Sequence, residues 1–251
     1  MAKANGHIIY RGNSLLDGKP IVVIAITNSL NKKTGNMVQT YILRENIDPV
    51  TANKTGEDYS ICGSCPLKGA PNDDPNYRSA KRRGCYVIVW QDPLSVWKAY
   101  KANRYYDLQG DKILRSIGRG RKVRLGSYGD PAAVPYYVWE SLIAEATGYN
   151  AYSHQSSIKT ADFRPERYMY SADSENEARI AWKNGMRTFR TINRVSEIIE
   201  DQEIICPGSK EGGRVTTCAN CGLCGGTSIQ GKNIAMVMHG NTRKFDLPQG
   251  I

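Results

Sequence analysis

Two groups of cysteines carry the strongest chemical signal in this chain. The first group has three members and the second has four: Cys62, Cys65 and Cys85, then Cys206, Cys218, Cys221 and Cys224. An odd total argues against a complete disulfide framework, and the N-terminal segment lacks the apolar stretch of a secretory signal. We therefore expect a cytoplasmic protein whose thiolates bind metal.

The spacing of the four-cysteine group favours an iron–sulfur cluster. Cys218, Cys221 and Cys224 are separated by two residues each, as in a bacterial ferredoxin, and Cys206 is followed by proline. Neighbouring glycines allow backbone N–H groups to turn towards sulfur. The alternative is a structural zinc site made by the same four thiolates, because zinc sites with four cysteines are common.

The three-cysteine group predicts a metal site with an open position. Cys62 and Cys65 form a Cys-x2-Cys pair, and 19 residues separate Cys65 from Cys85, so a loop must return Cys85 to the pair. Three thiolates on a [4Fe–4S] cluster would leave one iron free for a small ligand. Two alternatives stay open: a zinc ion with a fourth ligand from His or Asp, and one larger site shared by both groups.

The charge of the chain predicts an anionic partner. A formal net charge of +10 and a pI near 9.2 favour binding to nucleic acid or another polyanion, since clustered cations release counterions from phosphates. The alternative is a solvated basic face without a specific ligand. The longest strongly apolar run has six residues, so we expect no membrane span. The candidate nucleic-acid-binding residues are Arg82, Arg83, Arg119, Arg121, Lys122 and Arg124.

The order of apolar segments predicts one α/β domain over residues 1–251. We expect strands at 20–27, 38–44, 85–90, 121–126, 149–154, 167–172, 187–192, 203–206 and 233–238, and helices at 93–104, 132–147 and 174–184. Strands and helices alternate beyond Cys85, which is typical of parallel β/α units and favours a partial or degenerate TIM-like barrel. Segment 45–85 is expected to be a cysteine-containing loop, and segment 200–232 a cysteine-rich metal-binding excursion.

Distinctive polar residues follow the predicted strands. In parallel β/α folds, ligands bind beyond the carboxyl ends of the strands. The residues expected there are Gly126 to Asp130, His154 and Gln155, Ser171, Asp173, Asn193, Cys206 and His239. Asp130 before Pro131 is also typical of a helix N-cap, which can coexist with a ligand contact.

These motifs resemble radical S-adenosylmethionine enzymes. The resemblance rests on CGSCP leading to CYV, followed by the Gly-Asp-Pro turn in RLGSYGDPAAVP. It implies that Cys62, Cys65 and Cys85 hold the reactive cluster, and that Gly129, Asp130 and Pro131 form the turn that binds the methionine amino group. The four later cysteines would hold an auxiliary cluster. The candidate cofactor-binding residues are the three residues of this turn together with Gly126 and His154. The chain also resembles a group of uncharacterised bacteriophage proteins with the same segments. That resemblance names no activity, and for a phage gene it implies the cytoplasm of the host cell.

Two departures from the radical-enzyme pattern keep a second function open. The cysteine spacing is two and then nineteen residues rather than Cys-x3-Cys-x2-Cys, and Asp130 replaces a glutamate. The first function is therefore a radical enzyme with one or two [4Fe–4S] clusters, S-adenosylmethionine and a redox partner, acting on nucleic acid or another anionic substrate. The second is a non-catalytic nucleic-acid-binding protein stabilised by clusters or zinc.

Overall fold

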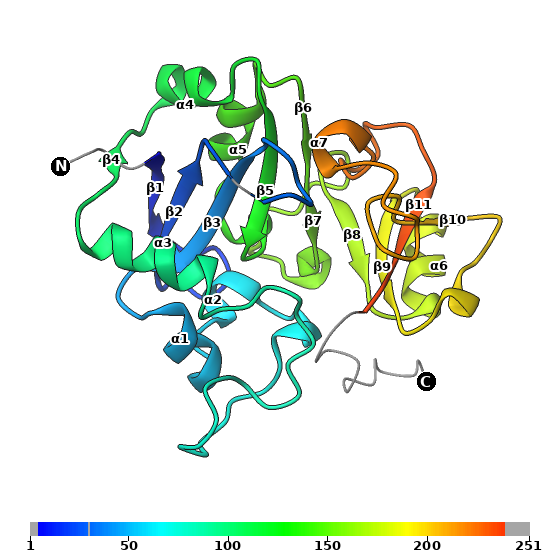
Figure 1. Cartoon of the computed structure of the whole chain (residues 1–251), viewed down its shortest axis with the longest axis horizontal. Helices are drawn as coiled ribbons and strands as arrows, with labels where there is room; N and C mark the ends of the chain where they lie inside the picture. The colour runs from blue at the N-terminus through cyan, green and yellow to red at the C-terminus, as the bar shows by residue number, and fades with distance from the viewer. Residues whose placement is uncertain (1–4, 30, 239–251) are drawn as a thin grey trace.

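Two β-sheets organise the chain in the computed structural model, which describes residues 5–29 and 31–238 (Figure 1). The first sheet has the order β4-β1-β2-β3-β5-β6, formed by Tyr106–Asp107, Gly6–Asn13, Pro20–Ile26, Val38–Arg44, Lys122–Tyr128 and Gly148–Asn150. The second has the order β10-β11-β9-β8-β7, formed by Glu203–Ile205, Asn233–Val237, Thr188–Ile192, Met169–Ala172 and Tyr152–Ser153. Only Ala151 separates β6 from β7, so the chain passes directly from one sheet to the next.

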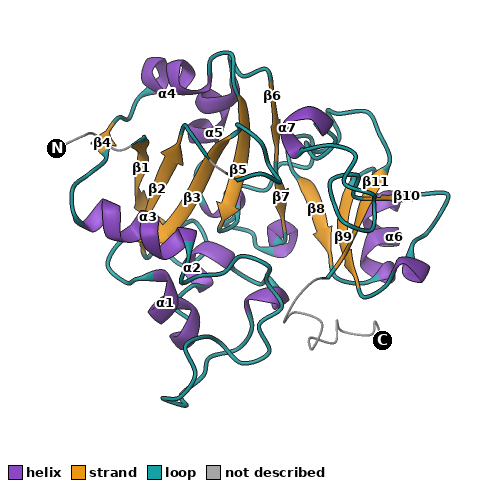
Figure 2. Ribbon diagram, in the orientation of Figure 1, coloured by secondary structure: helices purple, strands orange, loops and turns teal. Residues whose placement is uncertain are grey.

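Parallel pairing dominates beyond the first three strands. β1, β2 and β3 pair in antiparallel fashion, whereas β3 with β5, β5 with β6, and all pairs of the second sheet are parallel. The prediction of an α/β fold with parallel β/α units is therefore confirmed. The pairing of the described strands gives two open sheets, the first with β4 and β6 as its edge strands and the second with β10 and β7 (Figure 2).

Seven α-helices lie outside these sheets in the described part of the chain. They are α1 to α7, at Pro49–Thr55, Tyr59–Cys62, Asp92–Lys101, Asp111–Gly118, Tyr136–Ile143, Glu175–Lys183 and Cys218–Cys221. Helices α2 and α3 contact β3, α4 contacts α5, and α6 contacts β8 and β9. No helix among residues 5–29 and 31–238 combines the length and the apolar composition that crossing a membrane requires.

Several predicted elements differ from the structure. The strand predicted at 85–90 is wrong, because this segment consists of bends and a turn, although the run is rich in β-branched and aromatic residues. Segment 45–85, expected as loop, contains α1 and α2. Strand β1 and helix α4 were not predicted, and the helix predicted at 132–147 is a 3₁₀ turn at Pro131–Ala133 followed by α5.

The core lies where the central strands are covered on both faces. All residues from Ile21 to Ala25 in β2 are fully buried, which matches their continuous apolar sequence rather than an alternating one. Trp139 of α5 is also fully buried and donates its indole N–H to the carbonyl of Pro131 at 2.8 Å. This contact fixes α5 beside the turn that follows β5.

A buried ion pair joins β9 to β10. Arg190 is 4% exposed and Glu203 is 1% exposed, and the guanidinium donates two hydrogen bonds to the carboxylate, at 2.8 and 2.6 Å. The second carboxylate oxygen also accepts from the Ile199 N–H at 3.1 Å. Removing one member of such a pair leaves the other charge buried without its partner.

We expect Glu203→Gln to destabilise the fold by about 3–5 kcal/mol, because the Arg190 guanidinium would remain buried and uncompensated. For a chain of this size the melting temperature should fall by roughly 6–20 °C. Glu175→Gln is the matched control, since Glu175 forms an exposed ion pair with Arg179 at 2.7 Å. Thermal unfolding of both variants measures the difference, and an equal shift would contradict the role given to the buried pair.

Candidate metal and ligand site

The Cys62–Cys65 loop begins at the end of helix α2. Cys62 is the last residue of the helix, and its N–H donates to the carbonyl of Asp58 at 2.8 Å. Gly63 leaves the helix with a φ of 53°, and the Cys65 N–H then donates to the carbonyl of Cys62 at 3.2 Å. The chain therefore turns tightly between the two thiols, so both belong to one compact loop.

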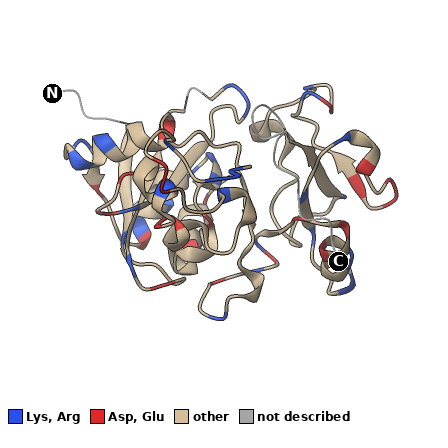
Figure 3. Ribbon diagram, turned by 90° about the horizontal axis from the view of Figure 1, so that it is seen from below, with Lys and Arg blue, Asp and Glu red and all other residues tan. Residues whose placement is uncertain are grey.

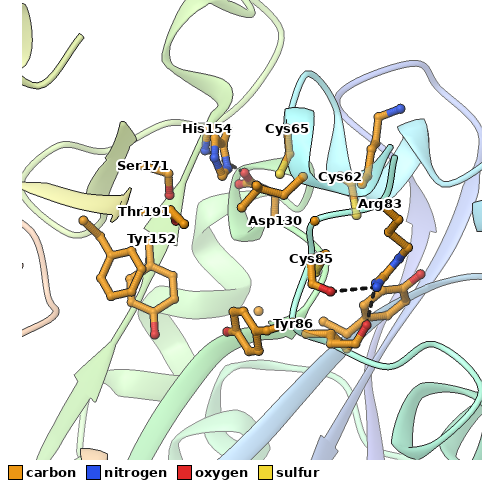
Figure 4. A pocket seen from close by; sticks show the side chains of 18 of the residues that line it. Cys62, Cys65, Arg83, Cys85, Tyr86, Asp130, Tyr152, His154, Ser171 and Thr191 are labelled. Atoms are coloured by element: carbon orange, nitrogen blue, oxygen red, sulfur yellow. Dashed lines mark hydrogen bonds between the residues drawn. The ribbon is translucent and has the colours of Figure 1, made fainter. Parts of the chain in front are cut away.

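A short antiparallel bridge returns Cys85 to this loop. Ala70 and Lys81 exchange two backbone hydrogen bonds, at 2.9 and 2.7 Å, which close the long segment after Cys65. The Cys85 N–H then donates to the carbonyl of Leu67 at 2.7 Å. Arg83 holds the following turn by donating to the carbonyls of Cys85 and Val87 (Figure 4). The segment after Cys65 therefore brings Cys85 back to the Cys-x2-Cys pair, as expected.

The three thiols line one cavity of about 140 Å³, which we call the strand-end cavity. Its other walls include residues in or directly after five parallel strands, β5, β7, β8, β9 and β11. These wall residues include Gly126 in β5, Gly129 and Asp130 after β5, His154 after β7, Ser171 in β8 and Thr191 in β9. Figure 4 shows Cys62, Cys65, Asp130 and His154 on the same side of the cavity.

Burial sets the protonation of these thiols. Burial raises the pKa of Cys62 well above its usual value, and Asp58 and Cys65 raise it further. Burial also raises the pKa of Cys85, while Arg83 opposes the shift. Both thiols are therefore neutral near pH 7 without metal, and a bound metal would displace their protons.

The Gly126–Asp130 turn closes the strand-end cavity from the β5 side. Gly129 has a φ of 85°, and a Cβ there would lie 2.7 Å from the Cβ of Ile42, so the turn passes too close to β3 for a side chain. Asp130 Oδ1 accepts from the Ala132 N–H at 3.0 Å, which confirms the predicted cap. Oδ2 accepts from the His154 N–H at 2.9 Å. The carboxylate therefore fixes two of the cavity walls relative to each other.

Gln155 joins the cysteine loop to this turn. Its side chain is fully buried and donates from Nε2 to the carbonyl of Cys62 and to Asp130 Oδ2, both at 2.9 Å. Its Oε1 accepts from the N–H of Ser64 at 3.1 Å and from the hydroxyl at 3.2 Å. The sequence places Gln155 at the end of a predicted strand. It does not indicate the bridging role, because an amide that bridges two loops has no sequence signature.

We expect Gln155→Ala to destabilise the protein by about 2–4 kcal/mol, because the variant leaves several buried polar groups without partners. Denaturant unfolding measures the change. Gln109→Ala is the control, since Gln109 is exposed and makes one hydrogen bond, to Asp107 at 2.8 Å. Equal stability of the two variants would show that Gln155 does not hold the loop.

His154 is the nearest additional metal-binding group. Its Nε2 lies 3.2 Å from Asp173 Oδ1, and its side chain lines the strand-end cavity beside Cys65. Burial alone lowers the pKa of His154, but Cys65 and Asp173 raise it, and the balance is well above the usual value. Asp173 therefore orients the imidazole, as carboxylates often do for metal-binding histidines.

The four later cysteines also come together. Cys218 and Cys221 are the first and last residues of α7, and Cys206 follows β10, where its N–H donates to the carbonyl of Ala235 at 2.8 Å. The carbonyl of Cys224 accepts from the Ala151 N–H at 2.7 Å. Burial, with Cys206 and Cys218, raises the pKa of Cys224 to about 12. The group therefore packs against the junction of the two sheets.

Three of these cysteines line a second cavity of about 260 Å³, which we call the inner cavity. Cys206, Cys218 and Cys224 form one side of it, and Arg124 of β5 contributes to the opposite lining. The inner and strand-end cavities share wall residues, namely Tyr86, Val87, Ser127, Tyr152, Phe189 and Met236. The two cysteine groups therefore line adjoining cavities.

The donor sets suit metal, but the thiols are not gathered around a single ion. Across residues 5–29 and 31–238, no three His, Cys, Asp or Glu side chains are arranged to hold one metal ion. Each group nevertheless offers soft thiolate donors lining a cavity, which is the chemistry that zinc and iron–sulfur clusters use.

The predicted basic residues are divided between the surface and the interior. Arg82, Arg119 and Arg121 are exposed, and Arg119 forms an ion pair with Glu145. Arg83 lines the strand-end cavity and Arg124 is buried. Figure 3 shows Lys and Arg spread over many elements with Asp and Glu among them. Lys122, partly buried at the start of β5, completes the predicted set.

Not every predicted strand-end residue reaches the strand-end cavity. Asn193 is exposed, and its N–H donates to Glu197 at 3.1 Å. Cys206 lines the inner cavity instead. His239 lies outside the described residues.

Comparison of the chain with protein-family models, with curated proteins and with solved structures gave no match.

Proposed function

We propose that this protein binds iron–sulfur clusters and is a radical S-adenosylmethionine-type enzyme that acts on an anionic substrate. The observation that carries the proposal is the convergence of Cys62, Cys65 and Cys85 with the Asp130 turn on one cavity at the carboxyl ends of parallel strands. Three thiols and a carboxylate from distant parts of the chain thus line one cavity.

The size of the bound group distinguishes a cluster from a single ion. A zinc ion draws its ligands to about 2.3 Å, so its thiolates stand close together. A four-iron cluster is larger, and its thiolates stand farther apart around a cubane. The three thiols line one cavity without being arranged around a single ion, so the cavity can accept the larger group. Three protein ligands would leave one iron open.

The fold also agrees with this class. We propose that the two sheets form parts of one partial β/α barrel, because parallel strands follow each other from β3 to β10 and only Ala151 separates β6 from β7. In such an arrangement the strand-end cavity lies where barrel enzymes bind ligands.

The residues of this chain have separate roles in the proposed site. The three cysteines hold the cluster, and the carboxylate of Asp130 receives the methionine ammonium group. Asp130 already accepts three hydrogen bonds from protein groups, which leaves about one acceptor site on a carboxylate. When bound and reduced, the cluster supplies the electron that cleaves S-adenosylmethionine. Asp173 and Gln155 hold His154 and the cysteine loop in place.

The test is reductive cleavage of S-adenosylmethionine by protein purified without oxygen. We expect methionine to be released only when dithionite is present, and we expect Asp130→Asn to weaken S-adenosylmethionine binding by about tenfold through loss of the charge. Iron-loaded protein that neither binds nor cleaves the compound would contradict the proposal.

A zinc-stabilised nucleic-acid-binding protein is the second candidate. It is favoured by the position of His154, which lies beside Cys65 and would complete a set of three cysteines and one histidine. The charge of +10 would then supply affinity for phosphates. This candidate predicts zinc in the purified protein and a binding constant for nucleic acid that falls steeply with salt.

A further inference from the structure

Arg124 is a buried cation without a carboxylate partner. It is 6% exposed and forms no ion pair with Asp or Glu among residues 5–29 and 31–238. One guanidinium nitrogen donates to the hydroxyl of Tyr86 at 2.5 Å, and the guanidinium carbon lies 5.1 Å from the ring centre of Tyr152. These contacts orient the side chain but supply no carboxylate, and the thiols of Cys218 and Cys224 lie close enough to act on its charge.

A guanidinium in this position needs an anion. Moving a charge out of water is costly unless a counter-charge or several hydrogen bonds replace the solvent. Buried Arg190 of the same protein has such a counter-charge in Glu203. The planar fork of an arginine matches the two oxygens of a phosphate or carboxylate, and Arg124 faces a cavity of about 260 Å³ where such a group fits.

The walls of the inner cavity suit a planar, unsaturated ligand. Tyr152 and Phe189 lie with ring centres 4.5 Å apart, and both line this cavity. Tyr86 lines both cavities and is 52% exposed, so its ring is available to a ligand. Aromatic rings of this kind stack on nucleobases without regard to sequence.

Charge at the edge of the inner cavity favours an anion as well. Lys33, on the exposed turn between β2 and β3, lines the cavity, and the same turn accepts the Cys218 N–H at 3.1 Å. Asp92, at the start of α3, is the one acidic residue among the described lining residues, and it is exposed. Two cations therefore face one solvated carboxylate.

We infer that the inner cavity binds a nucleotide, with its phosphate on Arg124 and its base against Tyr86, Tyr152 and Phe189. The inference rests on the proposed function in one respect, namely that a substrate binds inside the protein. Cys206, Cys218 and Cys224 line the same cavity, so metal content is measured on the same protein as nucleotide binding.

The test is calorimetric titration of the purified full chain with adenosine monophosphate, adenosine and inorganic phosphate. We expect the monophosphate to bind at least about tenfold more tightly than either fragment, and Arg124→Gln to remove that advantage. Arg179→Gln removes the same charge from an exposed ion pair on α6 and should bind like the wild type. Equal binding by Arg124→Gln and wild type would overturn the inference.

A second variant protects the test against misfolding. Lys33→Gln changes an exposed side chain, and we expect it to weaken binding of the monophosphate by about threefold to tenfold without affecting adenosine. A short single strand that binds more tightly than the monophosphate would assign the nucleotide to nucleic acid, and weaker binding of the strand would assign it to the free compound.

Metal content separates this inference from the proposed function. Zinc-loaded protein that binds the monophosphate through Arg124 would support the inference while contradicting the iron–sulfur enzyme. Wild-type protein that binds no nucleotide, together with loss of metal from the four-cysteine group in Arg124→Gln, would overturn it. Arg124 would then be the counter-charge of metal-bound thiolates.

Discussion

Replacing Cys85 by serine is expected to remove the first cluster and abolish cleavage of S-adenosylmethionine, while the second cluster remains. Serine is not ionised near neutral pH and is a poor ligand for soft metals. Cys85 is also the thiol that the Ala70–Lys81 bridge returns to the Cys62–Cys65 loop, so no neighbouring cysteine can replace it. Iron content should fall by about half, with the remaining absorption due to the four-cysteine group.

Cys221→Ser is the matched variant in the other group. It should lose the second cluster and keep the first, because the two groups line different cavities. Complete loss of the cluster signal from either single variant, in protein that still unfolds cooperatively, would show instead that both groups share one site.

Gly63→Ala is expected to have the second largest effect, through the geometry of the cysteine loop. Gly63 has a φ of 53°, and an added Cβ would lie 2.1 Å from Oε1 of Gln155, so the loop or the glutamine must move. Displacement of either one breaks the contacts that hold Cys62 and Cys65 beside Asp130. We expect the variant to fold, to lose metal from the first group and to keep it at the second, as measured by iron and zinc analysis.

Gly18→Ala separates backbone strain from the steric clash. Gly18 has a φ of 75°, but a Cβ there would meet no atom within 4 Å. The control should therefore lose about 1–2 kcal/mol of stability through strain and retain its full metal content. Equal metal loss in both variants, or none in Gly63→Ala, would contradict the role of the Gly63 contact.

The elements that sequence analysis predicted correctly have local signals. A continuous apolar run identified β2, and a segment with β-branched and aromatic residues identified β3. The serine cap of α6 is present, with the Ser174 hydroxyl accepting from the Glu177 N–H at 3.2 Å. Helix α1 carried an equally clear signal that was not used. Asp48 caps it before Pro49, as Asp130 caps the turn that begins at Pro131, and Gly56 ends it with a φ of 80°.

Other features depend on contacts that local sequence does not record. The segment from Cys85 to Trp90 has a strand-like composition, but its backbone is held by Leu67 and Arg83 instead of a neighbouring strand. The division of the cysteines into two groups could be read from spacing. The roles of Gln155 and Arg124 could not, because both arise from partners far away in the sequence.

The most direct test of the account is metal and sulfide analysis, with an absorption spectrum, on protein purified without oxygen and without added metal. If the two cysteine groups hold iron–sulfur clusters, the protein contains about four to eight irons per chain and a similar amount of sulfide. It then shows broad absorption at roughly 400 nm that bleaches with dithionite. A colourless protein that contains about one or two zinc ions per chain would contradict the account.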